Sequence, residues 1–450
     1  MKWLKILLTG MAVSLFYFPI TFTFFPVSNT KNLMAAVGLV CVLFFLVRKQ
    51  EFSFPRELVV LLLLSSFVSI VSLFSITYNQ TPDTSYVEYI RAATIWLSGA
   101  FAICMFIYLT HGRVDVPLLV NYLMAVCIFQ CVMTMLIHYI PAVQVFVDTY
   151  VSQGQGLLQR MDRLYGVGAS LDVGGSRFAA VLIAIAYMME ESKEKNGNTP
   201  KMLLVLAFCI ITVIGNMIAR TTIVGTIIGL AYVALMEMRR MGWKNPDDFH
   251  SSWLSWIAIL VILIPTGVTL YNTSPDFHDQ MRFGFEGFFS LFEKGEWEVR
   301  SNTTLEKMVV WPEELRTWVI GDGYFENQRN DRNYIGDATT AGYYMGTDIG
   351  YLRFLFYFGI IGLLAISAVM VYAGIIGCKA FPDHILLFVM GIVANFVVWL
   401  KVATDLFPFL SLFACLSFLH QELEILKQKE GPPEGQEAVT SESEQLAENE

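Results

Sequence analysis

Residues 202–238 read MLLVLAFCIITVIGNMIARTTIVGTIIGLAYVALMEM, and this stretch decides the fold class. Only two of its 37 residues are charged, Arg220 and Glu237. A single helix of this length would be about 55 Å long, whereas the hydrocarbon core of a bilayer is about 30 Å thick. Two membrane-spanning helices joined by a tight turn at Arg220 therefore explain the stretch better than one helix.

The rest of the chain repeats this apolar pattern. Of its 450 residues, 55% are hydrophobic and only 15% are charged, whereas soluble domains carry about 25% charged residues. We expect an all-α polytopic membrane protein with about 12 transmembrane helices, in which residues 1–420 form one transmembrane domain. The apolar runs lie at 6–25, 33–47, 58–77, 92–110, 116–140, 176–189, 202–219, 221–238, 253–271, 349–373, 384–400 and 404–420.

Positive charge in the short loops predicts the orientation of these helices. Cytoplasmic loops carry the excess of lysine and arginine, so the richer set of loops should face the cytoplasm and place both termini there. The richer set has thirteen such residues: Lys2, Lys5, Arg48, Lys49, Arg56, Arg113, Lys193, Lys195, Lys201, Arg239, Arg240, Lys244 and Lys379. The other set has seven: Lys31, Arg91, Arg160, Arg163, Arg177, Arg220 and Lys401.

The net charge of −9 is mostly local to the C-terminus. Residues 422–450 contain nine glutamates and two lysines, which account for −7 of it. Such a composition cannot bury an apolar core, so we expect residues 421–450 to form a disordered acidic cytoplasmic tail. The remaining −2 does not indicate a nucleic-acid partner. All seven cysteines fall in or beside apolar runs, which argues against a disulfide framework or a zinc site.

Two loops on the outward side are long, residues 141–175 and residues 272–347. The second has 76 residues and is rich in aromatic side chains, so we expect it to be ordered and partly helical. An apolar stripe at helical spacing runs through it. That stripe suits either a helix at the membrane surface or a face packed on the transmembrane bundle. Its members are Phe277, Met281, Phe285, Phe288 and Phe292.

Arginine and lysine are distributed unequally between the two sides. The outward segments hold eleven arginines and four lysines, whereas the cytoplasmic ones hold five and ten. Arginine binds phosphate and carboxylate through two parallel hydrogen bonds, so this surface suits a lipid-linked phosphate. The alternative is that the loop arginines pair with loop acids such as Asp162, Glu313 and Asp331. Arg220 has no acid nearby in the sequence, so it either binds an anion or extends to the membrane interface.

Four sequence segments resemble the superfamily of O-antigen polymerases and O-antigen ligases. These are VIGDGYF (319–325) followed by TDIGYLRFLFYFGIIGLL (347–364), RLYGVGASLDVGGSRFA (163–179), and ARTTIVG (219–225). The likeness covers roughly residues 150–375. It includes an arginine–ten residues–glycine spacing from Arg163 to Gly174.

Two departures from the family pattern affect the functional prediction. Where this chain has Asp348 and Ile349, the ligase branch typically has His-Asn. Polymerases have Ser-Asp or Thr-Asp at this place, and this chain resembles them in having Thr347 and Asp348. This favours a polymerase. A second arginine–ten–glycine spacing is missing from residues 272–347, which leaves the acceptor site unlocated.

The resemblance implies a metal-independent inverting glycosyltransferase that needs no cofactor. Such polymerases transfer a growing glycan from undecaprenyl pyrophosphate to a new lipid-linked repeat unit at the periplasmic face of the bacterial inner membrane. It implies Asp348 as the catalytic base, and Arg163, Arg177, Arg220 and Arg353 as substrate-binding residues. A chain-length regulator protein is a further partner that the family suggests. The product is O-antigen, capsule or exopolysaccharide.

Alternatives remain for the two ionisable residues beside the span at 349–373 and for the whole protein. Asp348 also suits a helix N-cap, and Arg353 also suits an ion pair with Asp348 or Asp405. Since Arg353 lies five residues after Asp348, a direct pair on one helix would need a bend or a long reach. The whole protein could instead be the ligase that moves a finished glycan to lipid A core or protein, or a flippase for lipid-linked oligosaccharides.

Overall fold

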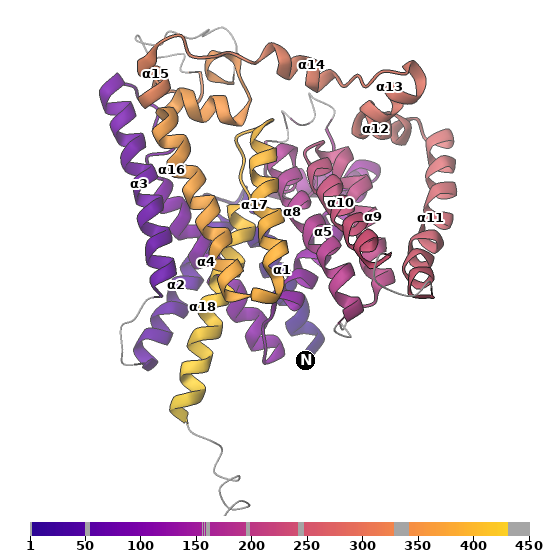
Figure 1. Ribbon diagram of the computed structural model, residues 1–450, viewed down its shortest axis with the longest axis horizontal. Coiled ribbons are helices and arrows are strands. Elements are labelled where there is room, and N and C mark those ends of the chain that lie inside the picture. The colour runs from indigo at the N-terminus through magenta and orange to yellow at the C-terminus, as the bar shows by residue number, and fades with distance from the viewer. Residues whose placement is uncertain are drawn as a thin grey trace, which may run out of the picture.

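The computed structural model is a bundle of long helices whose connections gather at two ends (Figure 1). It describes residues 2–49, 55–154, 156, 158, 163–194, 199–241, 247–327 and 342–430. The expected ion-pair partners Asp162 and Asp331 lie outside these residues. The chain is thus an all-α polytopic membrane protein, as the apolar runs predicted.

Each of the twelve apolar runs contains a helix, but the first run is helical only as far as Tyr17 and not to residue 25. Eight helices in the described part of the chain are long and apolar enough to cross a membrane: α3, α4, α5, α8, α9, α10, α16 and α17, the last with its preceding turn η2 (Pro382–His384). The bounds of all twelve are α1 (Lys2–Tyr17), α2 (Thr30–Lys49), α3 (Arg56–Asn79), α4 (Tyr89–His111), α5 (Val116–Tyr139), α8 (Leu171–Glu194), α9 (Lys201–Ile218), α10 (Thr222–Met241), α11 (Asp247–Thr273), α16 (Gly350–Ala380), α17 (Ile385–Trp399) and α18 (Phe407–Glu430).

Helices α9 and α10 are the two halves of the 37-residue stretch, and they confirm the predicted turn. Backbone helicity stops after Ile218 and resumes at Thr222, so Arg220 lies in the connection. Both helices pack on α8, and α10 does so through a close backbone contact at glycine. A Cβ added at Gly225 would lie 2.3 Å from the Cα of Ala179, so only glycine allows α10 to approach α8 this closely.

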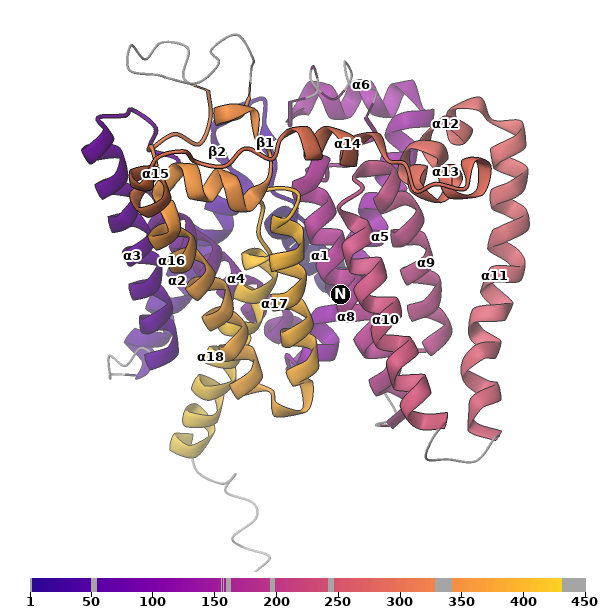
Figure 2. The same cartoon turned by 45° about the horizontal axis from the view of Figure 1, so that its top comes forward.

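The two ends of the bundle differ in what they carry. The N-terminal end of α1 and the C-terminal end of α18 lie at one end, and the long connection between α11 and α16 crosses the opposite end (Figure 1). Helix α6 (Pro141–Tyr150) lies at the same end as this connection (Figure 2). We call it the loop end.

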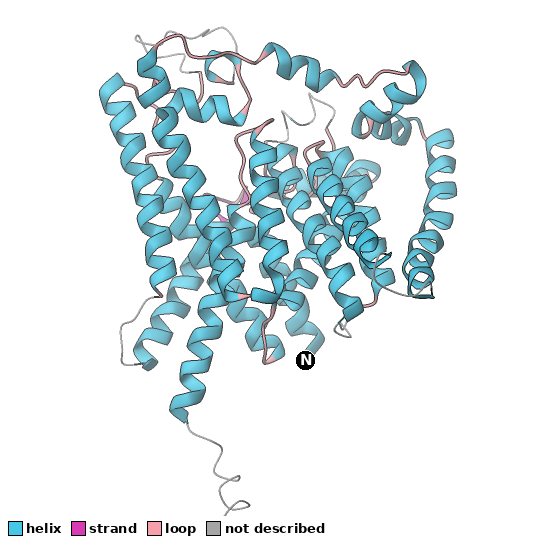
Figure 3. Cartoon of the chain, in the orientation of Figure 1, coloured by secondary structure: helices cyan, strands magenta, loops and turns pink. Residues whose placement is uncertain are grey.

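A small sheet accompanies the helices at the loop end (Figure 3). Strands β1 (Thr21–Phe22), β2 (Phe25–Asn29) and β3 (Val151–Ser152) are antiparallel neighbours in the order β2-β1-β3. The sheet joins the α1–α2 connection to the residues that follow α6.

The long connection is partly helical, as expected. It contains α12 (Pro275–Gly284), α13 (Glu286–Lys294), α14 (Arg300–Lys307), α15 (Leu315–Ile320) and the short turn η1 (Tyr344–Gly346). The apolar stripe does not form one helix, because the chain breaks between α12 and α13 at Phe285. Phe277 and Met281 pack against the core, whereas Phe292 is 87% exposed. The packed environment therefore applies to the first part of the stripe, and the membrane-surface environment stays a prediction for the second part.

The first part of the expected disordered tail is helical, because α18 continues to Glu430. Residues 431–450 lie outside the described residues, and the end of the transmembrane domain at residue 420 stays a prediction.

Helix α16 is broken near its start, at Phe358 and Gly359. Gly359 has φ +66 and ψ −168, which an L-residue rarely adopts. The break frees two carbonyl oxygens, and the turn Gly321–Gly323 after α15 binds both of them. The amide of Asp322 donates to the oxygen of Phe356 (2.6 Å), and the amide of Gly323 donates to that of Tyr357 (3.1 Å). Residues 350–357 therefore form a separate arm of α16.

Replacing Gly359 by alanine should destabilise the protein by about 1–3 kcal/mol or more, because the backbone is strained there. The added Cβ would also lie 2.2 Å from the carbonyl oxygen of Val319. Thermal unfolding of the purified protein in detergent measures the effect. Gly267→Ala is the matched control, since a Cβ there meets nothing within 4 Å. Equal unfolding temperatures for the two variants would contradict the proposed strain.

The loop end should face outward. In a cysteine-free background, cysteine at the exposed residue Glu296 should react with an impermeant thiol reagent in intact spheroplasts. Cysteine at the exposed residue Arg113, at the other end of the bundle, should react only after permeabilisation. Labelling of the second site and protection of the first would reverse the orientation.

Candidate functional site at the loop end

Asp348 lies outside helix α16, so its expected alternative role as an N-cap is wrong. The helix begins at Gly350, its N-cap is Ile349, and no side chain caps it. The carboxylate is 19% exposed, and its Oδ1 atom is buried and accepts no hydrogen bond from the residues that the structure describes. A buried acceptor without a donor is costly, which makes this oxygen a candidate for binding substrate.

Arg353 forms the ion pair with Asp348 that was one of its expected roles. Its Nη1 atom lies 3.6 Å from Oδ1 of Asp348, and its Nη2 atom donates to the carbonyl oxygen of Phe325 at 3.3 Å. The spacing argument against this pair fails because Asp348 precedes the helix. The guanidinium lies over the rings of Phe325 and Tyr343, at 3.7 Å and 4.5 Å from their centroids. Its Nε atom is buried and donates to no described residue.

The surroundings of Asp348 make its carboxylate more basic. Burial raises the pKa of Asp348 to about 6, Arg353 opposes this rise, and the charge of Asp172 adds to it. Burial and the carboxylate of Asp348 raise the pKa of the Tyr343 hydroxyl to about 12. At neutral pH, Asp348 is therefore ionised and can take a proton more readily than an ordinary aspartate.

Two further aspartates organise the backbone around Arg353. The Oδ2 atom of Asp83 accepts from the amides of Phe325 (2.8 Å) and Glu326 (3.3 Å), which fixes the carbonyl that Arg353 contacts. Asp322 accepts from the hydroxyls of Thr317 (2.6 Å) and Tyr344 (3.2 Å). Both carboxylates are thus engaged in supporting the turn, and neither is available as a base.

A second charged group lies near Asp348. The Nζ atom of Lys401 lies 2.8 Å from Oδ1 of Asp172 and donates to the Thr221 hydroxyl at 3.0 Å, and that hydroxyl also donates to Asp172. Lys401 follows α17, Asp172 begins α8, and Thr221 precedes α10. The group therefore ties three helices together at the loop end.

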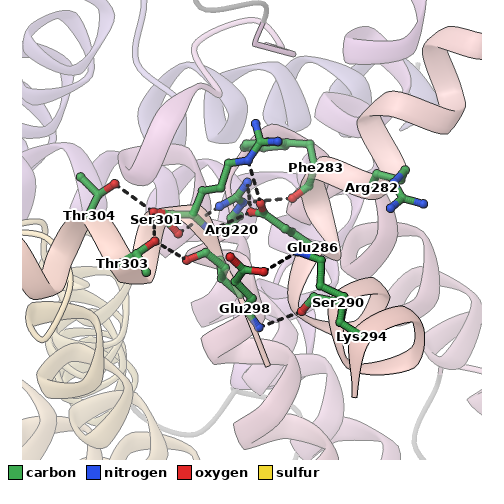
Figure 4. A network of polar contacts seen from close by, with 12 residues as sticks. Arg220, Arg282, Phe283, Glu286, Ser290, Lys294, Glu298, Ser301, Thr303 and Thr304 are labelled. Atoms are coloured by element: carbon green, nitrogen blue, oxygen red, sulfur yellow. Dashed lines mark hydrogen bonds and ion pairs between the residues drawn. The ribbon is translucent and has the colours of Figure 1, made fainter. Parts of the chain in front are cut away.

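Arg220 binds the long connection to the bundle (Figure 4). Its Nη2 atom lies 2.8 Å from Oε2 of Glu286, Nε donates to the Phe283 carbonyl at 3.0 Å, and Nη1 donates to the Ser301 hydroxyl at 3.0 Å. No acid lies near Arg220 in the sequence, as noted above, but the fold brings in Glu286 from 66 residues away, a partner that neither of the two expected roles included.

Arg163 lies beside Arg220 but has no acid of its own. Their guanidinium groups lie 3.9 Å and 4.1 Å from the centroid of the Phe283 ring. Among the described residues, the guanidinium of Arg163 makes no hydrogen bond or ion pair. Burial and the charge of Arg220 lower the pKa of Arg163, so an anion placed here would relieve their repulsion.

The glycine-rich turn after Arg163 is held by the protein itself. The side chain of Gln130 accepts from the amide of Val167 and donates to its carbonyl, both at 2.8 Å. Gln153 accepts from the amide of Gly168 at 2.7 Å. These amides therefore position Arg163 and are not free to bind a phosphate.

Arg177 is separate from the other arginines. It lies in the second turn of α8 with only 7% of its surface exposed, and Tyr17 donates to its carbonyl oxygen at 3.1 Å. Its guanidinium lies over the rings of Phe18 and Trp96. The four expected substrate-binding arginines thus divide into a pair at Arg163 and Arg220, Arg353 beside Asp348, and Arg177 on its own.

Four residues that sequence reasoning did not single out complete this end of the bundle: Asp83, Asp172, Glu286 and Lys401. Lys401 and Asp172 offered the only signal, as charged residues at the ends of apolar runs.

Comparison with family models, with curated proteins and with solved structures finds no match for this chain.

Removing the guanidinium of Arg220 should loosen the long connection. Arg220→Ala loses contacts to three separate loop residues, each worth roughly 1–3 kcal/mol for a charged hydrogen bond. Faster hydrogen exchange or proteolysis across residues 275–307 should follow, and Glu286→Gln should show part of the effect. Arg282→Ala is the control, because Arg282 pairs with Glu293 within the same segment, 2.6 Å away. If both arginine variants behave alike, Arg220 does not anchor the loop.

Proposed function

We propose that this protein polymerises lipid-linked oligosaccharide repeat units at the outer face of the bacterial inner membrane. It transfers the growing glycan from undecaprenyl pyrophosphate to an acceptor repeat unit, with inversion at the anomeric carbon. The observation that carries this proposal is the buried, unbonded Oδ1 atom of Asp348 beside the unbonded Nε atom of Arg353. The motif resemblance in residues 319–364 supports it.

Asp348 serves as the general base in this proposal. It accepts the proton of the acceptor hydroxyl while that oxygen attacks the anomeric carbon, and the bond from this carbon to the pyrophosphate oxygen breaks on the opposite side. The proton leaves Asp348 for solvent afterwards. A carboxylate with a pKa near 6 suits this step, because it is ionised at neutral pH and still basic.

The arginines act on the leaving group. Negative charge develops on the lipid pyrophosphate as its bond to the sugar breaks, and fixed cations stabilise that charge. Arg163 has no acid partner among the described residues and can bind a phosphate oxygen, whereas Arg220 must first release Glu286. Arg353 lies beside the base, where it orients Asp348 and meets the reacting sugar.

The proposed topology is based on the distribution of positive charge among the short loops. All twelve helices cross the membrane, both termini face the cytoplasm, and the loop end faces the periplasm, where lipid-linked repeat units are polymerised. A transporter would need charged groups along the middle of its spans. Here Asp348, Arg163, Arg220 and Lys401 all lie at the ends of helices or between them.

Asp348→Asn should reduce polymerisation about 100- to 10,000-fold, because the amide keeps the shape of the carboxylate but cannot accept the proton. Purified lipid-linked repeat units are the substrate, and thermal unfolding checks the fold of the variant. The matched control is Asp279→Asn, an acid of the same connection whose side chain is 80% exposed. Full activity of a folded Asp348→Asn protein would exclude this residue as the base.

The rate should also depend on the ionisation of Asp348. Burial raises its pKa to about 6, so the active, ionised form is lost as the pH falls through that value. Polymerisation under kcat/KM conditions should fall about tenfold per pH unit below about 6 and level off above it. A rate that stays constant down to pH 4.5, where an ordinary aspartate is still ionised, would contradict this assignment.

A further inference from the structure

Arg177 is a buried cation without a charged partner. Only 7% of the residue is exposed, yet its guanidinium makes no hydrogen bond and no ion pair with any residue that the structure describes. Removing a charge from water is costly unless a countercharge or hydrogen bonds compensate it. The described residues therefore do not offset the free-energy cost of burying this charge.

A second cation lies beside it. Lys31, at the start of α2, is close enough to Arg177 for the two charges to repel each other. The Lys31 Nζ atom and the Arg177 guanidinium carbon both lie 5.6 Å from the ring centroid of Trp96. The Nζ atom also makes no hydrogen bond or ion pair with a described residue. Two cations without a charged partner among the described residues, one from α2 and one from α8, thus lie near the same aromatic ring.

The acids around this pair do not neutralise it. Asp405 is near enough to Arg177 to attract it, but no ion pair within 4.0 Å forms, and its Oδ1 atom accepts the amide of Phe407 at 3.1 Å. Glu88 forms an ion pair with Arg91, in which Oε2 of Glu88 lies 2.6 Å from Nη1 of Arg91. Counting Lys31, Arg177 and Asp405, the group keeps one net positive charge.

The surface that helix α2 exposes beyond Lys31 is apolar. Beyond Lys31, helix α2 exposes Leu33, Leu39, Val40 and Leu43. An anion that approaches from this side comes with an apolar chain attached, because free ions do not enter the hydrocarbon region.

From this geometry we infer that Lys31 and Arg177, which both lie close to the ring of Trp96, form a binding site for a phosphate group carried by a lipid. The site is separate from the one at Arg163 and Arg220, and it does not depend on glycosyl transfer. Arginine supplies two parallel hydrogen bonds to phosphate oxygens, and lysine supplies a point charge.

Binding to the full-length protein in a phosphate-free maltoside detergent tests the inference. The probes are farnesyl pyrophosphate, phosphatidylglycerol and inorganic pyrophosphate, and Arg163→Ala serves as the background, so that the other arginine site does not contribute. Lys31→Ala and Arg177→Lys should each weaken binding of a lipid probe roughly tenfold. Lys294→Ala should leave it unchanged, because Lys294 is an exposed cation of the long connection paired with Glu298.

The probes distinguish the possible sources of the phosphate. Tighter binding of farnesyl pyrophosphate supports an isoprenoid carrier, and tighter binding of phosphatidylglycerol supports a bilayer lipid. Equal binding of inorganic pyrophosphate would overturn the assignment to a lipid. Unchanged affinity in both folded variants, Lys31→Ala and Arg177→Lys, would overturn the site itself. Since no acceptor glycan is present, none of these outcomes depends on polymerase activity.

Discussion

The loop end depends on the break in α16 at Phe358 and Gly359. A helix broken inside a membrane protein exposes backbone carbonyls that must find donors, and here the turn after α15 provides two of them. The hydroxyl of Ser75, from α3, donates to the same Tyr357 carbonyl at 2.7 Å. One short segment of backbone thus joins α3, α16 and the end of the long connection, and this junction places Arg353 beside Asp348.

The charged residues around this junction have three different roles. Asp83 and Asp322 are fully used in holding the turn, and the Asp172–Lys401 pair ties helices together. Asp348 and Arg353 differ from these residues: they form an ion pair, yet each keeps a buried polar atom that makes no hydrogen bond with a described residue. Folded proteins rarely leave such atoms unbonded, and those that do so often use them at functional sites. This contrast is why the proposed chemistry is assigned to Asp348 and not to its acidic neighbours.

The sequence predicted the fold far better than the site. Apolar run length is a local property, so every predicted run contains a helix and Arg220 lies in the predicted turn. Asp348 and Arg353 are also neighbours in sequence, and their proximity was foreseen as one alternative. The pairs Arg220–Glu286 and Asp172–Lys401 join segments 66 and 229 residues apart, and no local pattern encodes them. The N-cap expectation failed because α16 begins at Gly350, one residue later than its apolar run suggested.

The central claim is that this end of the bundle forms glycosidic bonds between lipid-linked repeat units. Reconstitution of the purified protein into liposomes with one defined undecaprenyl-pyrophosphate oligosaccharide tests it most directly. We expect a ladder of products that grow by one repeat unit, with one lipid pyrophosphate released for each bond formed. Movement of the intact substrate across the bilayer without new bonds would exclude polymerisation. So would transfer to lipid A core without any ladder.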